Sequence, residues 1–272
     1  MYCGESATEQ SWVQISTFRR KIIQDGGRFM KRQVSLEEIS DGRLYDKNDM
    51  VKAGCGGCKG CSSCCRGMGE SVILDPYDVY RLTKGTALSF EALLTNNLEL
   101  HVVDGIILPN LNMSGKDETC GFLDANGRCS IHAYRPGICR LFPLGRYYET
   151  DASGERTFRY FLQTKECPAP NKTKVKVSKW LDTPELVRYE QFVKEWHYFL
   201  EDVQQRIRKE EREEAVKNTN LFLLKLFYIK PYETDQDFYP QFESRLAWAR
   251  ETVLDETKYG HDQDTAGEDA RA

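Results

Sequence analysis

The sequence predicts an α+β protein, built from a small irregular cysteine-rich metal-binding module of short helices and hairpins, followed by a helical C-terminal part. Three observations lead to this prediction. Five of the ten cysteines fall within residues 55–65, which is typical of a thiolate-rich metal site. Residues 98–111 and 144–163 alternate around Asp-Gly and Ser-Gly turn pairs, as hairpins do. Beyond residue 183, apolar residues recur at steps of three and four, which indicates a long helix.

The chain divides into four regions. We expect an N-terminal extension with a short helix at 1–53, the cysteine module at 54–170, a helical region at 171–260 and a disordered tail at 261–272. With 272 residues, the chain is long enough to bury a core without metal or disulfide staples.

Helix starts are marked by capping residues. Ser35 with Glu38 fits a capping box, and Asp75 precedes a proline, which opens a helix through about Leu82. Ser89 opens another helix. The expected hairpins join 98–103 to 106–111 through Asp104-Gly105, and 144–150 to 157–163 through Ser153-Gly154.

The C-terminal region predicts three helices. The first carries an apolar stripe formed by Leu186, Tyr189, Val193, Trp196, Leu200, Val203 and Ile207. We expect the stripe to pack against the cysteine module or a neighbouring helix, with pairing to another chain as the alternative. The other two helices cover 221–229, closed by Pro231, and 242–254. Trp180, Trp196 and Trp248 are expected to anchor the core.

The first cysteine set comprises Cys55, Cys58, Cys61, Cys64 and Cys65. Disulfides suit small secreted chains, and such crowded thiols would make strained pairs, so metal ligation is favoured. The set contains the Cys-x2-Cys-x2-Cys-x3-Cys spacing of bacterial ferredoxins. Arg66 stands where those proteins have proline, and no second copy of the run occurs, which argues against a ferredoxin.

The second set is spread out and comprises Cys120, Cys129, Cys139 and Cys167. Residues 124–127 read as a turn between two short strands, so Cys120 and Cys129 are expected to face each other across a hairpin. His132 follows Cys129 at a ligand-like spacing, although a hydrogen-bonded or surface histidine is the favoured interpretation.

These motifs carry a family resemblance. The run Cys58-x2-Cys61-x2-Cys64-Cys65, followed by Cys120-Gly-Phe-Leu, Cys129-Ser-Ile-His132 and Arg135-Pro136-x2-Cys139-Arg140, resembles the YkgJ-type cysteine-cluster proteins, which carry a CxxCxxCC zinc- or iron-chelating domain. The resemblance covers roughly residues 55 to 170 and implies a metal-chelating module. Flagellin lysine-N-methylases have a similar cysteine-rich module, so an enzymatic role is implied as an alternative.

Cationic residues flank the cysteines. Arg66, Arg135, Arg140 and His132 are candidates for stabilising the negative charge of a thiolate centre, as is Arg128, and among the arginines Arg135 and Arg140 are favoured over Arg66 and Arg128. Two alternatives stay open for the arginines, namely ordinary surface salt bridges and binding of an anionic substrate.

The cysteine count bears on the number of centres. Two four-coordinate sites need eight thiolates, and nine clustered cysteines leave one surplus. Cys3, fifty residues from the others, is expected to be uninvolved. We expect two centres, with a slight preference for iron–sulfur over zinc because the ferredoxin-like spacing suits a cuboidal cluster.

Charge and motifs exclude several classes. The formal charge of −4 and pI of about 5.7 argue against gripping nucleic acid or an anionic membrane. No apolar run is long enough to span a bilayer, and the start lacks a secretory pattern, so we expect a cytoplasmic protein. Nucleotide-binding and hydrolase motifs are missing from the sequence.

The sequence supports three alternative hypotheses about function. The favoured hypothesis is a metal chelator whose partners are metal ions. The first alternative is a metal-dependent enzyme, methylase-like or redox, which predicts a concave arginine-bearing pocket beside the metal. The second is an interaction protein with purely structural metal, which would bind a protein partner through an exposed stripe on its C-terminal helices.

Overall fold

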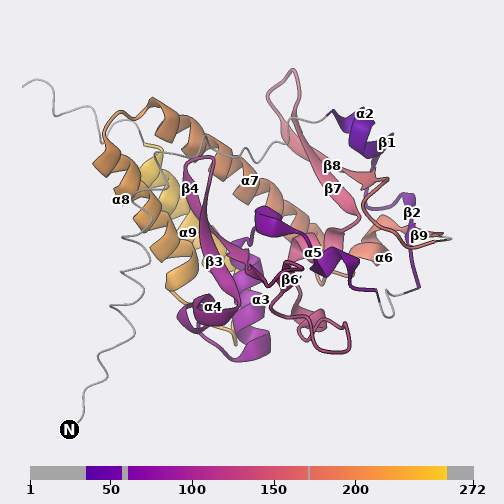
Figure 1. The fold of residues 1–272 in the computed structure, drawn as a ribbon. Coiled ribbons are helices and arrows are strands. Elements are labelled where there is room, and N and C mark those ends of the chain that lie inside the picture. The colour runs from indigo at the N-terminus through magenta and orange to yellow at the C-terminus, as the bar shows by residue number, and fades with distance from the viewer. Residues whose placement is uncertain (1–34, 57–60, 171, 256–272) are drawn as a thin grey trace, which may run out of the picture.

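The computed structural model describes residues 35–56, 61–170 and 172–255 (Figure 1). The predicted tail at 261–272 and most of the N-terminal extension lie outside these residues, as do Cys3 and Cys58. The described chain combines helices with small antiparallel sheets, which agrees with the predicted α+β class and its helical C-terminal part.

A three-stranded sheet joins the start of the described chain to its middle. Its order is β1 (Ser40–Tyr45), β8 (Arg156–Gln163) and β7 (Leu144–Thr150), all antiparallel. The β7–β8 hairpin is the one predicted from its Ser-Gly turn. A separate ribbon pairs β2 (Met50–Gly54) with β9 (Thr173–Lys176). Strands from the predicted N-terminal extension therefore complete sheets with segments that follow Cys139.

The predicted helix starts are confirmed. Helix α2 (Leu36–Ile39) follows Ser35, whose side chain accepts a hydrogen bond from the Glu38 amide at 3.3 Å. Helix α3 (Pro76–Thr86) follows Asp75 and extends past its predicted end, and α4 (Phe90–Asn96) follows Ser89.

The second predicted hairpin is also confirmed. It pairs β3 (Leu98–Val103) with β4 (Ile106–Leu111) in continuous register. Its two turn residues, Asp104 and Gly105, have φ of 51° and 86°, the left-handed backbone that a tight hairpin turn requires.

Short elements follow the β3–β4 hairpin and lead to the C-terminal part. These are β5 (Met113–Ser114) paired with β6 (Thr119–Cys120), the 3-10 turn η4 (His132–Tyr134), α5 (Gly137–Leu141) and α6 (Val177–Leu181). Two more 3-10 turns, η2 (Ser63–Cys65) and η3 (Gly69–Ser71), precede α3.

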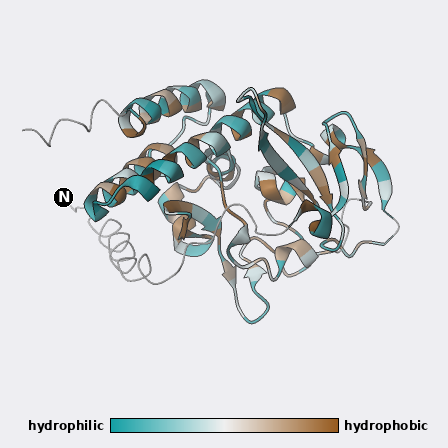
Figure 2. Cartoon of the chain, turned by 90° about the horizontal axis from the view of Figure 1, so that it is seen from above, coloured by the Kyte–Doolittle hydropathy of each residue, from teal (hydrophilic) through white to brown (hydrophobic). Residues whose placement is uncertain are grey.

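The C-terminal part is built from three helices. Helix α7 (Leu186–Lys209) is the longest, α8 (Glu213–Leu224) continues into the π-helical turn η5 (Lys225–Ile229), and α9 (Phe238–Val253) begins four residues before its predicted start. Seen from above, these helices carry hydrophilic and hydrophobic residues side by side along their length (Figure 2). Helix α7 is amphipathic, as its apolar stripe predicted.

The apolar stripe packs within the chain. Tyr189 and Val203 are 1% and 0% exposed, and the five central stripe residues are all buried. On α7, Phe192 lies between α3 and α9, with its ring centroid 6.0 Å from that of Tyr77 and 4.6 Å from that of Phe242. Packing against neighbouring elements is thus confirmed, and the stripe leaves no exposed apolar face for a second chain.

One of the three expected tryptophan anchors is wrong. Trp196 is buried and Trp180 is partly buried, with its indole N–H donating to the Leu141 carbonyl at 3.3 Å. Trp248 is 52% exposed and touches Phe222 edge-on. It lies on the outward side of α9, where residue type alone did not reveal its position.

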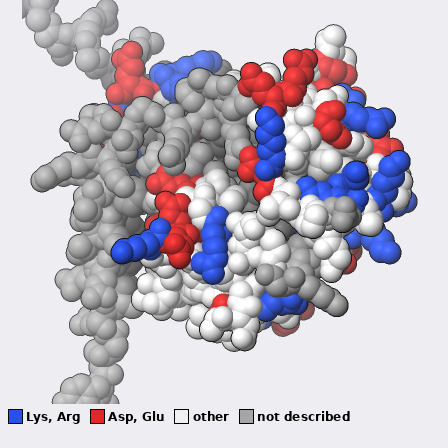
Figure 3. Space-filling view, turned by 45° about the vertical axis from the view of Figure 1, so that its right-hand side comes forward, with Lys and Arg blue, Asp and Glu red and all other residues white. Residues whose placement is uncertain are grey.

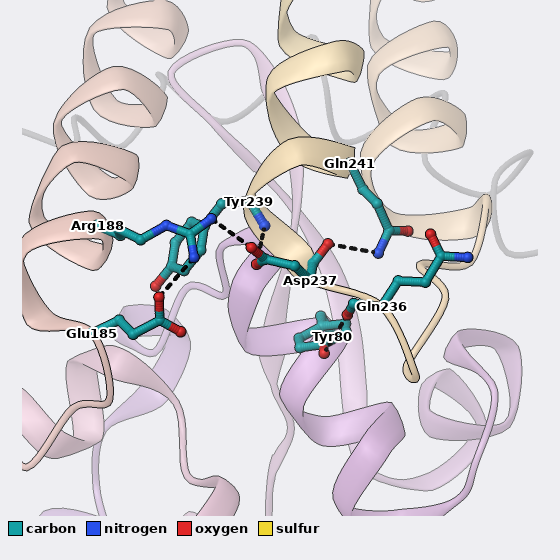
Figure 4. A network of polar contacts seen from close by, with 7 residues as sticks. All are labelled: Tyr80, Glu185, Arg188, Gln236, Asp237, Tyr239 and Gln241. Atoms are coloured by element: carbon teal, nitrogen blue, oxygen red, sulfur yellow. Dashed lines mark hydrogen bonds and ion pairs between the residues drawn. The ribbon is translucent and has the colours of Figure 1, made fainter.

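A polar network ties the starts of α7 and α9 together (Figure 4). Arg188 donates to Glu185 and to Asp237, both at 2.6 Å, and its guanidinium lies 4.4 Å from the centroid of the Tyr239 ring. Asp237 also accepts the Tyr239 amide, which caps α9. This network joins the starts of two helices that both pack against α3.

Surface charge is mixed on the face drawn in Figure 3, where acidic and basic side chains are interspersed. Within the described part of the chain, no helix is both long enough and apolar enough to cross a membrane.

Candidate metal centre

Six cysteines line one cavity of about 80 Å³. They are Cys61, Cys64, Cys65, Cys120, Cys129 and Cys139, and no disulfide joins them. They come from four separate stretches of chain, so tertiary folding brings together the two cysteine sets seen in the sequence. The rest of the wall is largely apolar and includes Val72, Leu111, Met113 and Phe122.

The first set is presented by a turn that is tied to the second set. Cys64 and Cys65 lie in η2, where the Cys65 amide donates to the Ser62 carbonyl at 2.9 Å. Just beyond, Arg66 forms a β-bridge with Thr119, and its guanidinium donates to the Thr119 hydroxyl at 2.9 Å. Arg66 therefore holds the segment of Cys64 and Cys65 against that of Cys120.

The predicted hairpin between Cys120 and Cys129 differs from the observed pairing. The turn at 124–127 is present, with the Gly127 amide donating to the Asp124 carbonyl at 3.0 Å. However, Cys129 bridges to Leu123, whereas Cys120 lies in β6 opposite Met113. Cys120 therefore belongs to the β5–β6 ribbon. The thiols of Cys120 and Cys129 both line the cavity, but they do not face each other across a hairpin.

Burial and neighbouring groups shift the thiol pKa values. Burial raises the pKa of Cys120, Cys129 and Cys139 above the usual range for a thiol. Hydrogen bonding between the adjacent thiols raises the pKa of Cys64 and lowers that of Cys65. The thiolate form of this group thus needs a positive charge beside it.

The four predicted charge-stabilising residues have different surroundings. Arg135 and His132 line the cavity, together with Arg128. The charge of Arg135 lowers the pKa of both Cys64 and Cys129, against the larger raising effects there. Arg140 is 4% exposed and is not part of the cavity wall; its guanidinium lies 5.7 Å from the centroid of the Tyr189 ring.

The two remaining described cysteines are not among the residues that line the cavity. Cys55 directly follows β2, whose last residue Gly54 pairs with Thr173 at the start of β9. Cys167 precedes β9, and its carbonyl accepts a hydrogen bond from the Lys172 ammonium group at 2.8 Å. Both cysteines thus lie off the same end of the β2–β9 ribbon.

The thiols surround the cavity rather than meeting at one point. Among residues 35–56, 61–170 and 172–255, no three His, Cys, Asp or Glu side chains are grouped so that they could hold a metal ion as they stand. The chemistry of the wall nevertheless fits a metal that prefers sulfur, since six thiols and two arginines share it.

Comparison with known families identifies this region. Residues 57–168 match the family model for CxxCxxCC, described as "Putative zinc- or iron-chelating domain". The chain contains a CxxCxxCC domain. No curated protein and no solved structure matches the chain.

The CxxCxxCC domain spans eight of the ten cysteines, from Cys58 to Cys167. Cys55 and Cys3 lie outside it. The domain also contains Asp78, whose carboxylate accepts a hydrogen bond from the Gly137 amide, two residues before Cys139. Sequence reasoning recognised only the local capping role of the Asp75–Asp78 segment, because the bond to Gly137 spans 59 residues.

Proposed function

We propose that this chain is a cytoplasmic zinc- or iron-chelating protein whose metal is held by cysteine thiolates of the CxxCxxCC domain. The observation that carries the proposal is the convergence of six cysteines from four chain segments on one cavity. A cytoplasmic location is proposed because the thiols must stay reduced to bind metal.

We propose two thiolate centres. Two four-coordinate sites need eight thiolates, and the CxxCxxCC domain contains eight cysteines. The six cavity thiols supply the first centre and part of the second. Cys55 lies outside both the cavity wall and the family match, which supports it as the surplus cysteine.

Iron–sulfur is slightly preferred over zinc, on the ferredoxin-like spacing of the first set. A bound cluster would supply electron transfer, whereas zinc would supply structural stability or Lewis acidity. In either case Arg135 offsets the negative charge of the thiolates, and the apolar wall limits access of water.

Metal analysis of the purified chain tests this proposal. The protein is purified anaerobically, and its zinc, iron and acid-labile sulfide are quantified together with its visible absorbance. We expect bound metal in the wild-type chain and a loss of metal in Cys129→Ser, because the substitution removes a cavity thiol. Cys3→Ser is the control and should keep the wild-type metal content. A wild-type chain without zinc or iron would contradict the proposal, and a colourless protein with stoichiometric zinc would end its iron–sulfur form.

A metal-dependent redox enzyme is the second candidate, and one observation favours it. The cavity that the thiols line also bears Arg128 and Arg135 on its wall, which supports the enzyme alternative with its expected arginine-bearing pocket. A redox role requires a centre that accepts electrons, which an anaerobic dithionite titration of the purified protein measures. If the protein takes up no electrons, the redox-enzyme function is excluded. The interaction alternative has lost its predicted surface, since the α7 stripe is buried.

A further inference from the structure

Cys139 lies in α5, a short helix of five residues. Helix α5 begins at Gly137 after Pro136, and no side chain of its own segment caps it. Short helices are marginal without outside contacts, because few of their backbone groups are paired within the helix. The position of the Cys139 thiol therefore depends on contacts between α5 and other parts of the fold.

A buried carboxylate from another helix supplies the missing cap. Asp78, on α3, is 2% exposed, and its Oδ1 accepts the Gly137 amide hydrogen at 2.7 Å. Its Oδ2 accepts from the Asp75 amide at 3.2 Å, while Asp75 accepts from the Asp78 amide at 2.8 Å. The same side chain thus caps α5 and completes the capping box of α3.

The opposite side of Gly137 is closed by α7. A Cβ atom at residue 137 would lie 2.0 Å from the Tyr189 hydroxyl, so no side chain fits there. Tyr189 is 1% exposed and its hydroxyl accepts from Arg146 at 3.2 Å, which holds the ring in place. Gly137 is therefore clamped between Asp78 and Tyr189, two residues from a cavity cysteine.

We infer that Asp78 is a positioning residue for Cys139, fixing the start of α5 so that this thiol faces the cavity in the metal-free chain. The inference rests on the proposed function for its effect on metal, but the placement of the thiol can be measured without any metal. Removing this acceptor leaves the Gly137 amide buried without its hydrogen-bond partner, which is costly, so α5 is freed locally.

Site-resolved alkylation of the metal-free chain tests the placement. The reduced, metal-free protein is labelled with iodoacetamide, and the labelling rate of each cysteine is read from peptide mass spectra. In Asp78→Ala we expect Cys139 to react about tenfold faster or more relative to Cys120, because the cap of α5 is gone.

Two matched variants separate positioning from general destabilisation. Asp75→Ala also breaks the α3 capping box but leaves the Gly137 bond, so the rate ratio of Cys139 to Cys120 should stay within about twofold of wild type. Asp78→Asn keeps an oxygen that can accept the Gly137 amide hydrogen and should restore most of the wild-type ratio. Equal ratios in Asp78→Ala and Asp75→Ala would overturn the inference.

If Asp78→Ala does not fold, as judged by circular dichroism, substitutions at Gly137 and Tyr189 test the placement of α5 instead. Gly137→Ala should raise the rate ratio of Cys139 to Cys120, and Tyr189→Phe in the same chain should lower it again by removing the hydroxyl that the new methyl group meets. A Gly137→Ala ratio equal to wild type would overturn the inference.

Metal affinity supplies the second readout. Zn²⁺ binding, measured by competition with a chelator, should weaken by about 10- to 100-fold in Asp78→Ala and remain near wild type in Asp75→Ala. If wild type binds no Zn²⁺ or iron, the proposed function fails, while the alkylation ratios still decide the role of Asp78. If wild type binds metal and the alkylation ratios do not change, only the inference about Asp78 fails.

Discussion

Arg135 and Arg140 both adjoin the same cysteine-bearing turn, yet the fold gives their guanidinium groups different neighbours. Arg135 lines the thiol cavity, and its charge acts on Cys64 and Cys129. Arg140 is buried and stacks over Tyr189. Both residues were equally strong candidates from the sequence alone, because closeness to a cysteine along the chain does not tell which way a side chain points.

Replacing Arg135 tests its effect on the thiolates. Arg135→Gln should weaken Zn²⁺ binding by about tenfold, because the substitution removes a positive charge beside groups that bind metal only when ionised. Chelator competition at neutral pH measures the affinity. Arg159→Gln, which removes an arginine paired with Glu149 on the β7–β8 hairpin, is the matched control and should leave the affinity unchanged. Equal affinities in the two variants would exclude a role for Arg135.

The elements were predicted best where a local signal marks their start. Ser35, Asp75 and Ser89 each precede a helix as predicted, and the Asp104-Gly105 turn sets the register of β3 and β4. Such signals act over a few residues and need no tertiary contact. The pairing of Cys120 with Met113 and the β2–β9 ribbon escaped prediction, because their partners are chosen by the packing of distant segments.

Helix α9 shows what the apolar register alone misses. Its predicted start at Phe242 came from the spacing of apolar residues, whereas the helix begins at Phe238 behind the cap Asp237. That residue also pairs with Arg188 on α7, so one carboxylate both starts α9 and attaches it (Figure 4).

Removing this carboxylate should destabilise the protein. We expect Asp237→Ala to lower the free energy of unfolding by about 1 kcal/mol, the usual cost of losing an N-cap; the exposed ion pair adds little. Denaturant unfolding followed by circular dichroism measures the change. The neighbouring exposed Asp235→Ala should stay within about 0.5 kcal/mol of wild type. A similar loss in both variants would argue that α9 does not depend on the Asp237 cap.

At the scale of the whole molecule, aromatic packing joins the cysteine region to the helices. Cys65, Cys129 and Cys139 pack against the large core that contains α3, α7 and α9. Burial raises the pKa of the hydroxyls of five tyrosines in this core, which are Tyr77, Tyr189, Tyr228, Tyr232 and Tyr239. The folded protein therefore holds their protons more tightly than the unfolded chain does.

This difference predicts alkaline unfolding. Unfolded tyrosine ionises near pH 10, so above that pH the native state binds more protons than the unfolded state, and stability falls as pH rises. Below pH 10 the contribution is fully present. Tyr45 lies in the smaller core, which includes residues of the β1–β8–β7 sheet. Burial and its hydrogen bond to Asp41 raise its pKa to about 12, so its contribution to stability is lost between pH 10 and about pH 12.

Substitution at Tyr45 isolates this contribution. Between pH 10 and 12, the free energy of unfolding should decline less steeply in Tyr45→Phe than in wild type, as measured by denaturant titrations at fixed pH. Tyr147→Phe, at a side chain that is 40% exposed, should keep the wild-type slope. Identical slopes in all three proteins would contradict the assignment.

The sequence by itself determined the α+β class, the main helices and hairpins, and the CxxCxxCC domain, because capping residues, turn pairs, apolar periods and cysteine spacing are local. Only the tertiary structure decided which thiols share a cavity, that Arg135 faces them while Arg140 does not, and that Asp78 reaches Gly137. These outcomes depend on burial and on contacts between residues far apart in the chain. Burial and long-range contacts contribute free energy only once the core has formed.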